Sequence, residues 1–566
     1  MALHWEGDHL KTRWKAVPVA VAIAAQGLFS SVALAHDPDD FGTPLSDPFG
    51  ERFSFISNFQ TDQNPFNAAN RHVTSSDIAF WGDLAYVGDY GGFRIFDVSE
   101  PVGRLVSNVR CYGPQGDPSV FDRDSDGNAD TLVLSVDSVL TGPQCGAGPA
   151  TKVFGQYPSG SWEGVRIFDV SNPAAPVQVA AVYQDCGSHT NTLLPNPEGD
   201  SMYVLNSSYP LGDGPTCGPP GVAAGRAVNH GVVQVVEVPF DNPADAAELT
   251  ELPIVYPGDA DGVYKPASEQ GLSGVLDNFL GCHDLSVFPA KGIVGAACGE
   301  QAQVWEIDAE TGLPDTAHPR WVYDQPNVDF WHSATFSWDG KVANFIDESF
   351  GDGCPTTTTK TGGLPGGPRV FETGNMFFFD TETGGLFSEY RIERGTNGDS
   401  FDPNDPRRLT YCSSHLGIPV PAKDRYLLVN AYYRGGSSVI DFSNPSKPKE
   451  IAFADLWGTN TWSAYTYPRT SGKQHTIPVY SNDGLSRNYG GGHFPEAAYG
   501  FQRFQSDVGS IDLVGLDRLN PQLQETLVDT IAGLPRGRSN GSPRAGMHGR
   551  PAPEGASNHS GRPQFK

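Results

Sequence analysis

Two similar stretches decide the fold, GFRIFDVSEP at 92–101 and GVRIFDVSNP at 164–173, and a shorter copy, SVIDFSNP, occupies 438–445. In each copy a run of β-branched and aromatic residues ends at Asp, followed within a few positions by Ser and Pro. Such a run is typical of a β-strand, and the residues after it are typical of a tight turn. The sequence therefore predicts one strand–turn unit that is repeated along the chain.

Weaker copies of the unit are GVVQVVEVPFDNP (231–243), AQVWEID (302–308) and NMFFFDTETG (375–384). Upstream of the copies lie a second apolar run and, before it, a first one. The first runs are DIAFW (77–81), DPSVF (117–121), TNTLLP (190–195), DLSVFP (284–289), SATFSW (333–338), LGIPVP (416–421) and SAYTYP (463–468). The last unit has no obvious outer strand, and RFSFISNFQ (52–60) would supply it. We therefore expect an all-β chain with a single seven-bladed β-propeller over 51–515, its ring closed by the N-terminal strand, with six or eight blades as alternatives.

The repeats resemble the LVIVD-repeat family of exported bacterial β-propellers, whose strand has the form G-[VL]-x-[VI]-x-D-[VI]-S-[ND]-P. The resemblance extends over roughly residues 50–515 and is clear in three copies. It implies a propeller fold and carries little information about activity.

The two ends of the chain differ in composition from the repeats. Lys11, Arg13 and Lys15, an apolar run at 17–29 and the sequence Ala33-Leu34-Ala35 are typical of a secretory signal peptide. The expected segments are a signal peptide (1–35), a linker (36–50), a short helix (516–534) and a disordered tail rich in Gly, Pro and Arg (535–566). We therefore expect a secreted, periplasmic or cell-surface protein without a transmembrane segment in the mature chain.

One position recurs just before each first strand, and we call it the opening position. Along the chain it holds Ser76, Gly116, His189, His283, His332, His415 and Trp462. Because first strands line the channel of a propeller, four consecutive histidines would point to one mouth of it. Imidazole is a good ligand for Fe, Cu or Zn, so the pattern predicts a four-histidine metal centre. The alternative is that the histidines are turn residues that recur because the repeats share ancestry.

Other ionisable residues are expected on the same face. Four carboxylates are candidates for an acceptor that orients a ligand histidine, or for a general base: Glu163, Asp347, Glu348 and Asp352. Turn stabilisation explains each of them as well. His230 and His493 are weaker candidates for the site.

Eight cysteines also map to the histidine face. An even number in an exported chain favours disulfides. We expect them to staple long loops, with Cys111–Cys145, Cys186–Cys217, Cys282–Cys298 and Cys354–Cys412 as the expected pairs.

A separate motif, DRDSDGNAD, occupies 122–130. Its expected ligands alternate along the loop: Asp122, Asp124, Asp126, the backbone of Asn128, and Asp130. This spacing is typical of calcium loops, so we expect a structural Ca²⁺ on the opposite face; the alternative is an acidic turn.

A formal net charge of −28 argues against nucleic acid as a partner. Three functions remain. The first is a metal-dependent oxidoreductase that acts on a small extracellular substrate. The second is a non-catalytic propeller that binds an extracellular protein or glycan and contains structural calcium. The third is a protein that sequesters a metal.

Overall fold

The computed structural model describes residues 52–59, 75–146, 162–208, 231–255, 281–299, 301–324, 328, 330–348, 374–392, 413–433, 435–456, 459, 461–483 and 500–530. These residues form β-strands and the short 3-10 helices η3 (Pro243–Asp245) and η4 (Pro289–Lys291). None of the described helices has the length and apolar character needed to cross a membrane. The predicted signal peptide (1–35), linker (36–50) and tail (535–566) lie outside the described residues.

Consecutive strands pair antiparallel into separate sheets, as expected of a propeller. The first sheet is β2 (Ser75–Trp81), β3 (Leu84–Asp89), β4 (Gly92–Asp97) and β5 (Arg104–Arg110), with β29 (Arg518–Leu519) added beside β2. The second is β6 (Gln115–Phe121), β7 (Thr131–Thr141), β8 (Trp162–Asp169) and β9 (Val177–Tyr183). The third is β10 (Thr190–Pro195), β11 (Ser201–Ser207), β12 (Val232–Pro239) and β13 (Ala247–Pro253). The fourth is β14 (Asp284–Phe288), β15 (Ile293–Cys298), β16 (Gln301–Glu306) and β17 (Trp321–Tyr323). The fifth is β18 (Trp331–Phe336), β19 (Val342–Asp347), β20 (Met376–Asp380) and β21 (Leu386–Tyr390).

The remaining strands form one eight-stranded sheet in the order β1-β28-β27-β26-β22-β23-β24-β25. Its members are β1 (Phe53–Asn58), β22 (Leu416–Pro419), β23 (Leu427–Ala431), β24 (Ser437–Asp441), β25 (Lys449–Ala454), β26 (Thr461–Tyr465), β27 (Gly472–Asp483) and β28 (Gly500–Leu513). Within it β22 pairs with β26 in parallel, which joins two antiparallel sets of four strands. The N-terminal strand β1 pairs antiparallel with β28 and forms one edge.

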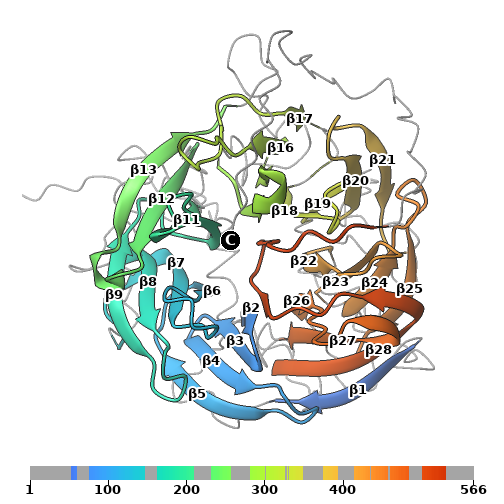
Figure 1. The fold of residues 1–566 in the computed structure, drawn as a ribbon, viewed down its shortest axis with the longest axis horizontal. Helices are drawn as coiled ribbons and strands as arrows, with labels where there is room; N and C mark the ends of the chain where they lie inside the picture. Colours follow the sequence, from blue (N-terminus) through green and yellow to red (C-terminus); the bar gives the residue numbers. More distant parts are fainter. Residues whose placement is uncertain are drawn as a thin grey trace, which may run out of the picture.

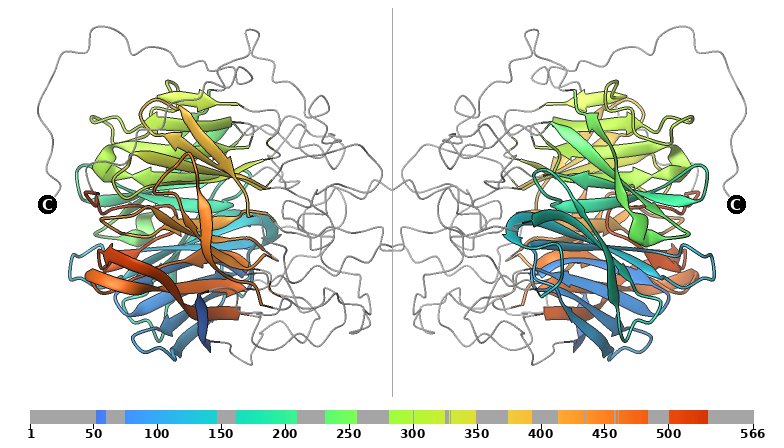
Figure 2. Two further views of the ribbon diagram at one scale, coloured as in Figure 1. Left: turned by 90° about the vertical axis from the view of Figure 1, so that its right-hand side faces the viewer. Right: turned by 90° about the vertical axis from the view of Figure 1, so that its left-hand side faces the viewer.

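All of the sheets lie around a common centre (Figure 1). Strands β2, β6, β18, β22 and β26 are innermost, and β5, β9, β13, β21 and β25 lie at the rim (Figure 1). Seen from the side, the sheets share a single layer (Figure 2). The predicted first runs are therefore the strands nearest the centre.

The start and the end of the repeated strand are set by local interactions of its backbone. Gly92 and Gly164 start the two clearest copies at φ 135° and 136°. A Cβ at either position would lie 2.1 Å from a carbonyl oxygen of the neighbouring strand, so only glycine fits. At the other end, Asp169 accepts a hydrogen bond from the backbone N–H of Ser171, and Asp441 accepts one from Ser443. The carboxylate thus closes the turn after the strand.

Middle strands are apolar on both faces because neighbouring sheets cover both. On β7, Leu132 and Leu134 pack against side chains of the β2–β5 sheet, whereas Val133 packs against the β10–β13 sheet. All three are fully buried. The core is therefore a set of layers between adjacent sheets.

The predicted helix over 516–534 is wrong for its described part, which ends at residue 530. This segment is extended and crosses the ends of the inner strands. The side chain of Asn520 donates to the carbonyl oxygen and accepts from the N–H of Val120 on β6. Gln524 makes the same pair of bonds with Phe336 on β18. Backbone N–H and C=O groups at the edge of the inner strands need hydrogen-bond partners. Supplying these partners outweighs the preference of the local sequence for a helix.

Two predicted disulfides are present, Cys111–Cys145 and Cys282–Cys298. Cys186 is also disulfide-bonded. The predicted partner Cys217 and the predicted pair Cys354–Cys412 lie outside the described residues. Disulfides are consistent with an extracellular location.

Candidate metal centre

The four predicted histidines open four inner strands. His189, His283 and His415 directly precede β10, β14 and β22, and His332 is the second residue of β18. The backbone N–H of His283 donates to Ala297 on β15 at 2.8 Å, and that of His415 donates to Ala431 on β23 at 3.0 Å. The antiparallel pairing thus continues to the histidine itself and fixes its place. For His283, the disulfide between Cys282 and Cys298 adds a covalent link at the same point.

The imidazole rings form a continuous row. Ring centres are 4.2 Å apart between His189 and His283, 3.9 Å between His283 and His332, and 4.2 Å between His332 and His415. All four histidine residues are at most 6% exposed. The opening positions of four inner strands therefore converge, as the sequence predicted.

Three of the rings use Nδ1 to hold a protein acceptor. His189 bonds to the carboxylate of Asp137 at 2.7 Å, and His283 bonds to that of Asp284 at 3.0 Å. His415 bonds to the carbonyl oxygen of Trp462 at 2.6 Å. The tautomer with its proton on Nδ1 satisfies each of these bonds and leaves a lone pair on Nε2.

The fourth ring, His332, makes no hydrogen bond to the described residues although it is buried. Its Nε2 lies 3.7 Å from Oε2 of Glu348, and Nε2 of His415 lies 4.0 Å from Oε1 of the same carboxylate. Ligand atoms of His283, His332 and Glu348 all lie within 4.8 Å of one another. Tyr433 donates a 2.5 Å hydrogen bond to Glu348 and so orients it.

Electrostatics favour the neutral form of three of the rings. Burial, reinforced by neighbouring imidazoles, lowers the pKa of His283, His332 and His415 well below the usual value. Burial also raises the pKa of Glu348 to about 7, against the hydrogen bond from Tyr433. Neutral imidazole is the form that binds metal ions.

Aromatic side chains occupy the neighbouring part of the mouth. Trp462, at the next opening position, lies edge-on to His415 with ring centres 4.7 Å apart. Tyr90, from the turn after β3, is 6.2 Å from Trp462 and donates to Gln115. An apolar wall thus adjoins the polar row of histidines.

The predicted carboxylates differ in whether they contact the histidines. Glu348 reaches the histidines, whereas Asp347 accepts hydrogen bonds from the backbone N–H groups of Phe330 and Gly374. Glu163 is buried, and burial together with the charges of Asp137 and Asp185 raises its pKa well above the usual value. Asp352, His230 and His493 lie outside the described residues.

The repeat pattern alone does not predict that Asp137, Asp284 and Tyr433 belong to the site. For Asp137 there was a signal, since an aspartate near the end of the second strand recurs as Asp89, Asp137 and Asp347. Most copies of that aspartate stabilise turns, and only the fold reveals which one meets a histidine. Asp284 directly follows His283 in sequence, but strand alternation gave no reason to pair them.

The predicted calcium loop joins β6 and β7, at the end of β6 remote from the opening position. Carboxylate oxygens of Asp122, Asp124 and Asp130 lie within 4.8 Å of one another. Asp126 instead accepts a 2.8 Å bond from the N–H of Asn128. Three of the four predicted carboxylates therefore converge.

Comparison with known proteins identifies the repeat. The family model of the LVIVD repeat matches residues 74–103, 159–183 and 431–454. These matches include the three copies of the motif that are clearest in the sequence. A search of curated proteins finds no match to the chain.

Proposed function

We propose that this protein, whose chain carries LVIVD repeats of the β-propeller type, is a metal-dependent oxidoreductase. Its ion would be held by His189, His283, His332 and His415. The observation that carries the proposal is the convergence of ligand atoms from His283, His332 and Glu348 within 4.8 Å of one another. The acceptors at Nδ1 support it, because a ligand histidine commonly has such an acceptor at its other nitrogen. Asp137, Asp284 and the carbonyl of Trp462 would be these acceptors.

Distances around Glu348 support a common ion. Two ligand atoms that each lie about 2.1 Å from one ion are separated by roughly 3–4 Å. The 3.7 Å and 4.0 Å separations from Glu348 to His332 and His415 fall in this range. Glu348 would thus join the site as a carboxylate ligand or as a proton acceptor beside it, held by Tyr433.

The ligand types favour iron among Fe, Cu and Zn. Histidine with one carboxylate is the ligand set of many non-haem iron sites, in which open positions bind oxygen or substrate. His283, His332 and Glu348 are such a set. When bound, the ion would supply redox chemistry, and the aromatic wall of Tyr90 and Trp462 would exclude water from a small substrate beside it.

Two structural elements complete the proposal. The ring would have seven blades, because the eight-stranded sheet divides at the parallel β22–β26 pair, and β1 would close it as the outer strand of the last blade. The loop of Asp122, Asp124 and Asp130 would bind Ca²⁺ and hold the β6–β7 turn.

Elemental analysis of the purified protein tests the proposal. We expect about one transition-metal ion per chain, together with calcium. His332→Ala and His283→Ala should each lose the transition metal and keep the calcium. The matched control is His318→Ala, because His318 is solvent-exposed and lies outside the site.

Each outcome has a definite meaning. If the protein contains calcium only, the metal centre is wrong and a non-catalytic binding propeller takes its place. If the metal is present but no oxidation of small substrates depends on His332, the protein sequesters metal rather than acting as an enzyme. Calcium that survives Asp122→Ala together with Asp124→Ala would reject the calcium loop.

A further inference from the structure

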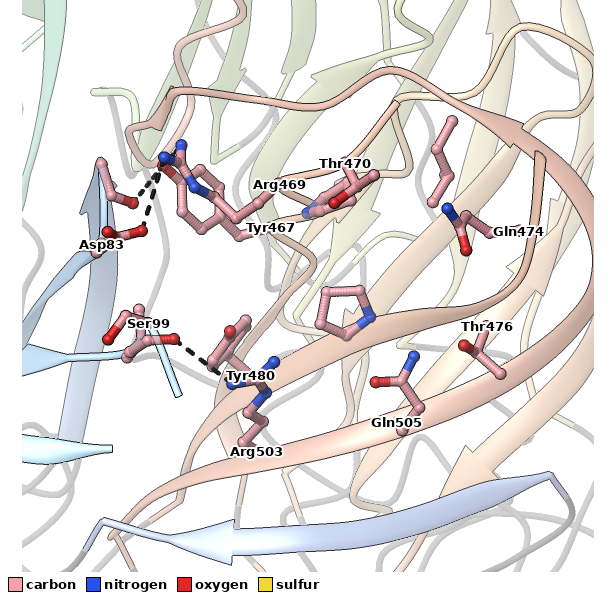
Figure 3. A pocket seen from close by; sticks show the side chains of 15 residues that line it. Asp83, Ser99, Tyr467, Arg469, Thr470, Gln474, Thr476, Tyr480, Arg503 and Gln505 are labelled. Carbon is pink, nitrogen blue, oxygen red and sulfur yellow. Dashed lines mark hydrogen bonds and ion pairs between the residues drawn. The ribbon is translucent and has the colours of Figure 1, made fainter. Parts of the chain in front are cut away.

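A polar cavity of about 320 Å³ has none of the four histidines in its lining. Figure 3 shows the residues that line it. One wall is the face of β27 and β28 that bears Gln474, Thr476 and Pro478 on one strand and Gln505 on the other. The opposite wall comes from turns of the β2–β5 sheet at Asp83 and Ser99. Its volume is at the lower end of the range for small-molecule sites, about 300–1,000 Å³.

The polarity of this face departs from the rest of the fold. On β27, Ile477 and Val479 point to the core and are fully buried, whereas the alternating residues Gln474, Thr476 and Pro478 are partly exposed. The middle strands of other sheets, such as β7, meet their neighbours through apolar side chains. Here amides and a hydroxyl line the cavity between two sheets, so its polar character is not required by packing.

Two arginines reach the cavity from fixed positions. Arg503 stacks on Tyr480 with its guanidinium carbon 5.4 Å from the ring centre, and it donates to the carbonyl oxygen of Glu100. Arg469 stacks on Tyr467 at 5.3 Å and donates to the carbonyl oxygen of Leu516. Both side chains are therefore held before any ligand arrives, which reduces the entropic cost of binding.

The two arginines differ in their carboxylate neighbours: Arg469 has two exposed ones, whereas Arg503 has none among the described residues. No carboxylate of the described residues forms an ion pair with Arg503. Those nearest to Arg469, Asp83 and Asp517, are 3.7 Å and 3.5 Å away and are largely exposed, so solvent screens them. In a chain with a net charge of −28, such a pair of guanidinium groups is a local site for an anion.

We propose that this cavity binds an acidic saccharide. The carboxylate of the sugar would meet the guanidinium groups of Arg503 and Arg469. Its hydroxyls would exchange hydrogen bonds with Gln474, Gln505 and Thr476, whose side chains offer both donors and acceptors. The ring of Pro478 offers an apolar patch for the C–H face of a pyranose. This site is separate from the proposed metal centre, and neither depends on the other.

Calorimetric titration with glucuronate tests the proposal, with glucose and acetate as partial ligands. Glucuronate should bind at least tenfold more tightly than either, because only glucuronate has both the carboxylate and the ring hydroxyls. Arg503→Lys keeps the charge but loses the fork of N–H donors, and it should weaken glucuronate binding about tenfold. Gln505→Ala should weaken glucuronate binding and leave acetate unchanged.

The control is Arg104→Ala, because Arg104 is exposed, pairs with Asp97 and lies outside the cavity. This variant should bind glucuronate as the unaltered protein does. Equal affinity for acetate and glucuronate would overturn the saccharide in favour of a simple anion site. Absence of glucuronate binding, or an equal effect of the Arg503 and Arg104 substitutions, would overturn the site itself.

Discussion

Gln524→Ala is expected to destabilise the protein strongly even though Gln524 belongs to none of the strands. The side-chain amide of Gln524 accepts a 2.8 Å hydrogen bond from the N–H of Phe336 and donates a 2.5 Å bond to its carbonyl oxygen. It therefore acts as one extra rung beside β18, and only 1% of the residue is exposed. Asn520 serves β6 in the same manner through Val120.

The magnitude follows from what alanine leaves behind. Each hydrogen bond contributes about 1 kcal/mol net, and each buried backbone group left without a partner costs about 1–3 kcal/mol. Two such groups of Phe336 would lose their partner, so the free energy of unfolding should fall by about 2–6 kcal/mol. The backbone N–H of Gln524, which donates to Val287, is unaffected by the change.

Urea unfolding followed by tryptophan fluorescence measures this effect as a shift in midpoint at constant slope. The matched control is Leu527→Ala in the same segment, because Leu527 is 42% exposed and should contribute only about 0.5 kcal/mol. If both variants unfold at the same urea concentration, the inner strands do not depend on this segment and our account of it is refuted.

Three further changes have defined outcomes. Asp137→Asn should weaken transition-metal affinity about 10–100-fold, measured by chelator competition, because the acceptor of His189 loses its charge. Replacing both Cys111 and Cys145 by Ala should lower the free energy of unfolding by about 3–4 kcal/mol in urea, because the disulfide closes a loop with a sequence separation of 34. Asp77→Asn should stabilise the protein increasingly as pH rises from about 4 to about 7, because burial, with Asp284 adding to it, raises the pKa of Asp77 to about 7 in the folded chain.

The sign of the pH effect follows from linkage. A carboxyl whose folded pKa exceeds its unfolded pKa favours folding when protonated, and this contribution is lost as pH rises through the folded value. The asparagine variant cannot ionise and still accepts the hydrogen bond from Tyr465. A stability difference that is constant with pH would show that Asp77 does not titrate in this range.

For Asp137, the control is Asp89→Asn, at the equivalent end of β3, where the carboxylate bonds to Gly91 rather than to a histidine. For the disulfide, an unchanged urea midpoint would contradict the expected role of the crosslink.

The local sequence pattern predicts the structure correctly where residues that are close in sequence interact with one another. Alternation in GFRIFDV and GVRIFDV predicted β4 and β8, and the turn chemistry after Asp97 and Asp169 predicted where each ends. The opening position predicted the convergence of His189, His283, His332 and His415, because equivalent positions of a repeat occupy equivalent places around an axis. Cys111–Cys145 and Cys282–Cys298 followed from the same reasoning.

The local pattern does not predict segments whose hydrogen bonds are made to residues far away in the sequence. The stretch containing Asn520 and Gln524 has the composition of a helix, and only the exposed edges of β6 and β18 make an extended path better. Asp137 belongs to a strand 52 residues before His189, and its sequence context does not distinguish it from Asp89. The cavity of Arg469 and Arg503 forms between two sheets, so neither strand alone encodes it.

Residues a few places apart in the sequence specify the strand repeat, its turns and the histidine at four opening positions. The partners at Nδ1 of those histidines, the contact with Glu348 and the course of the C-terminal segment depend instead on the folded arrangement. Such contacts join residues from different sheets, and their free energy depends on burial and on the acceptors left unpaired after the sheets have assembled. The histidine row is thus encoded locally, whereas its chemical environment is a property of the assembled ring of sheets.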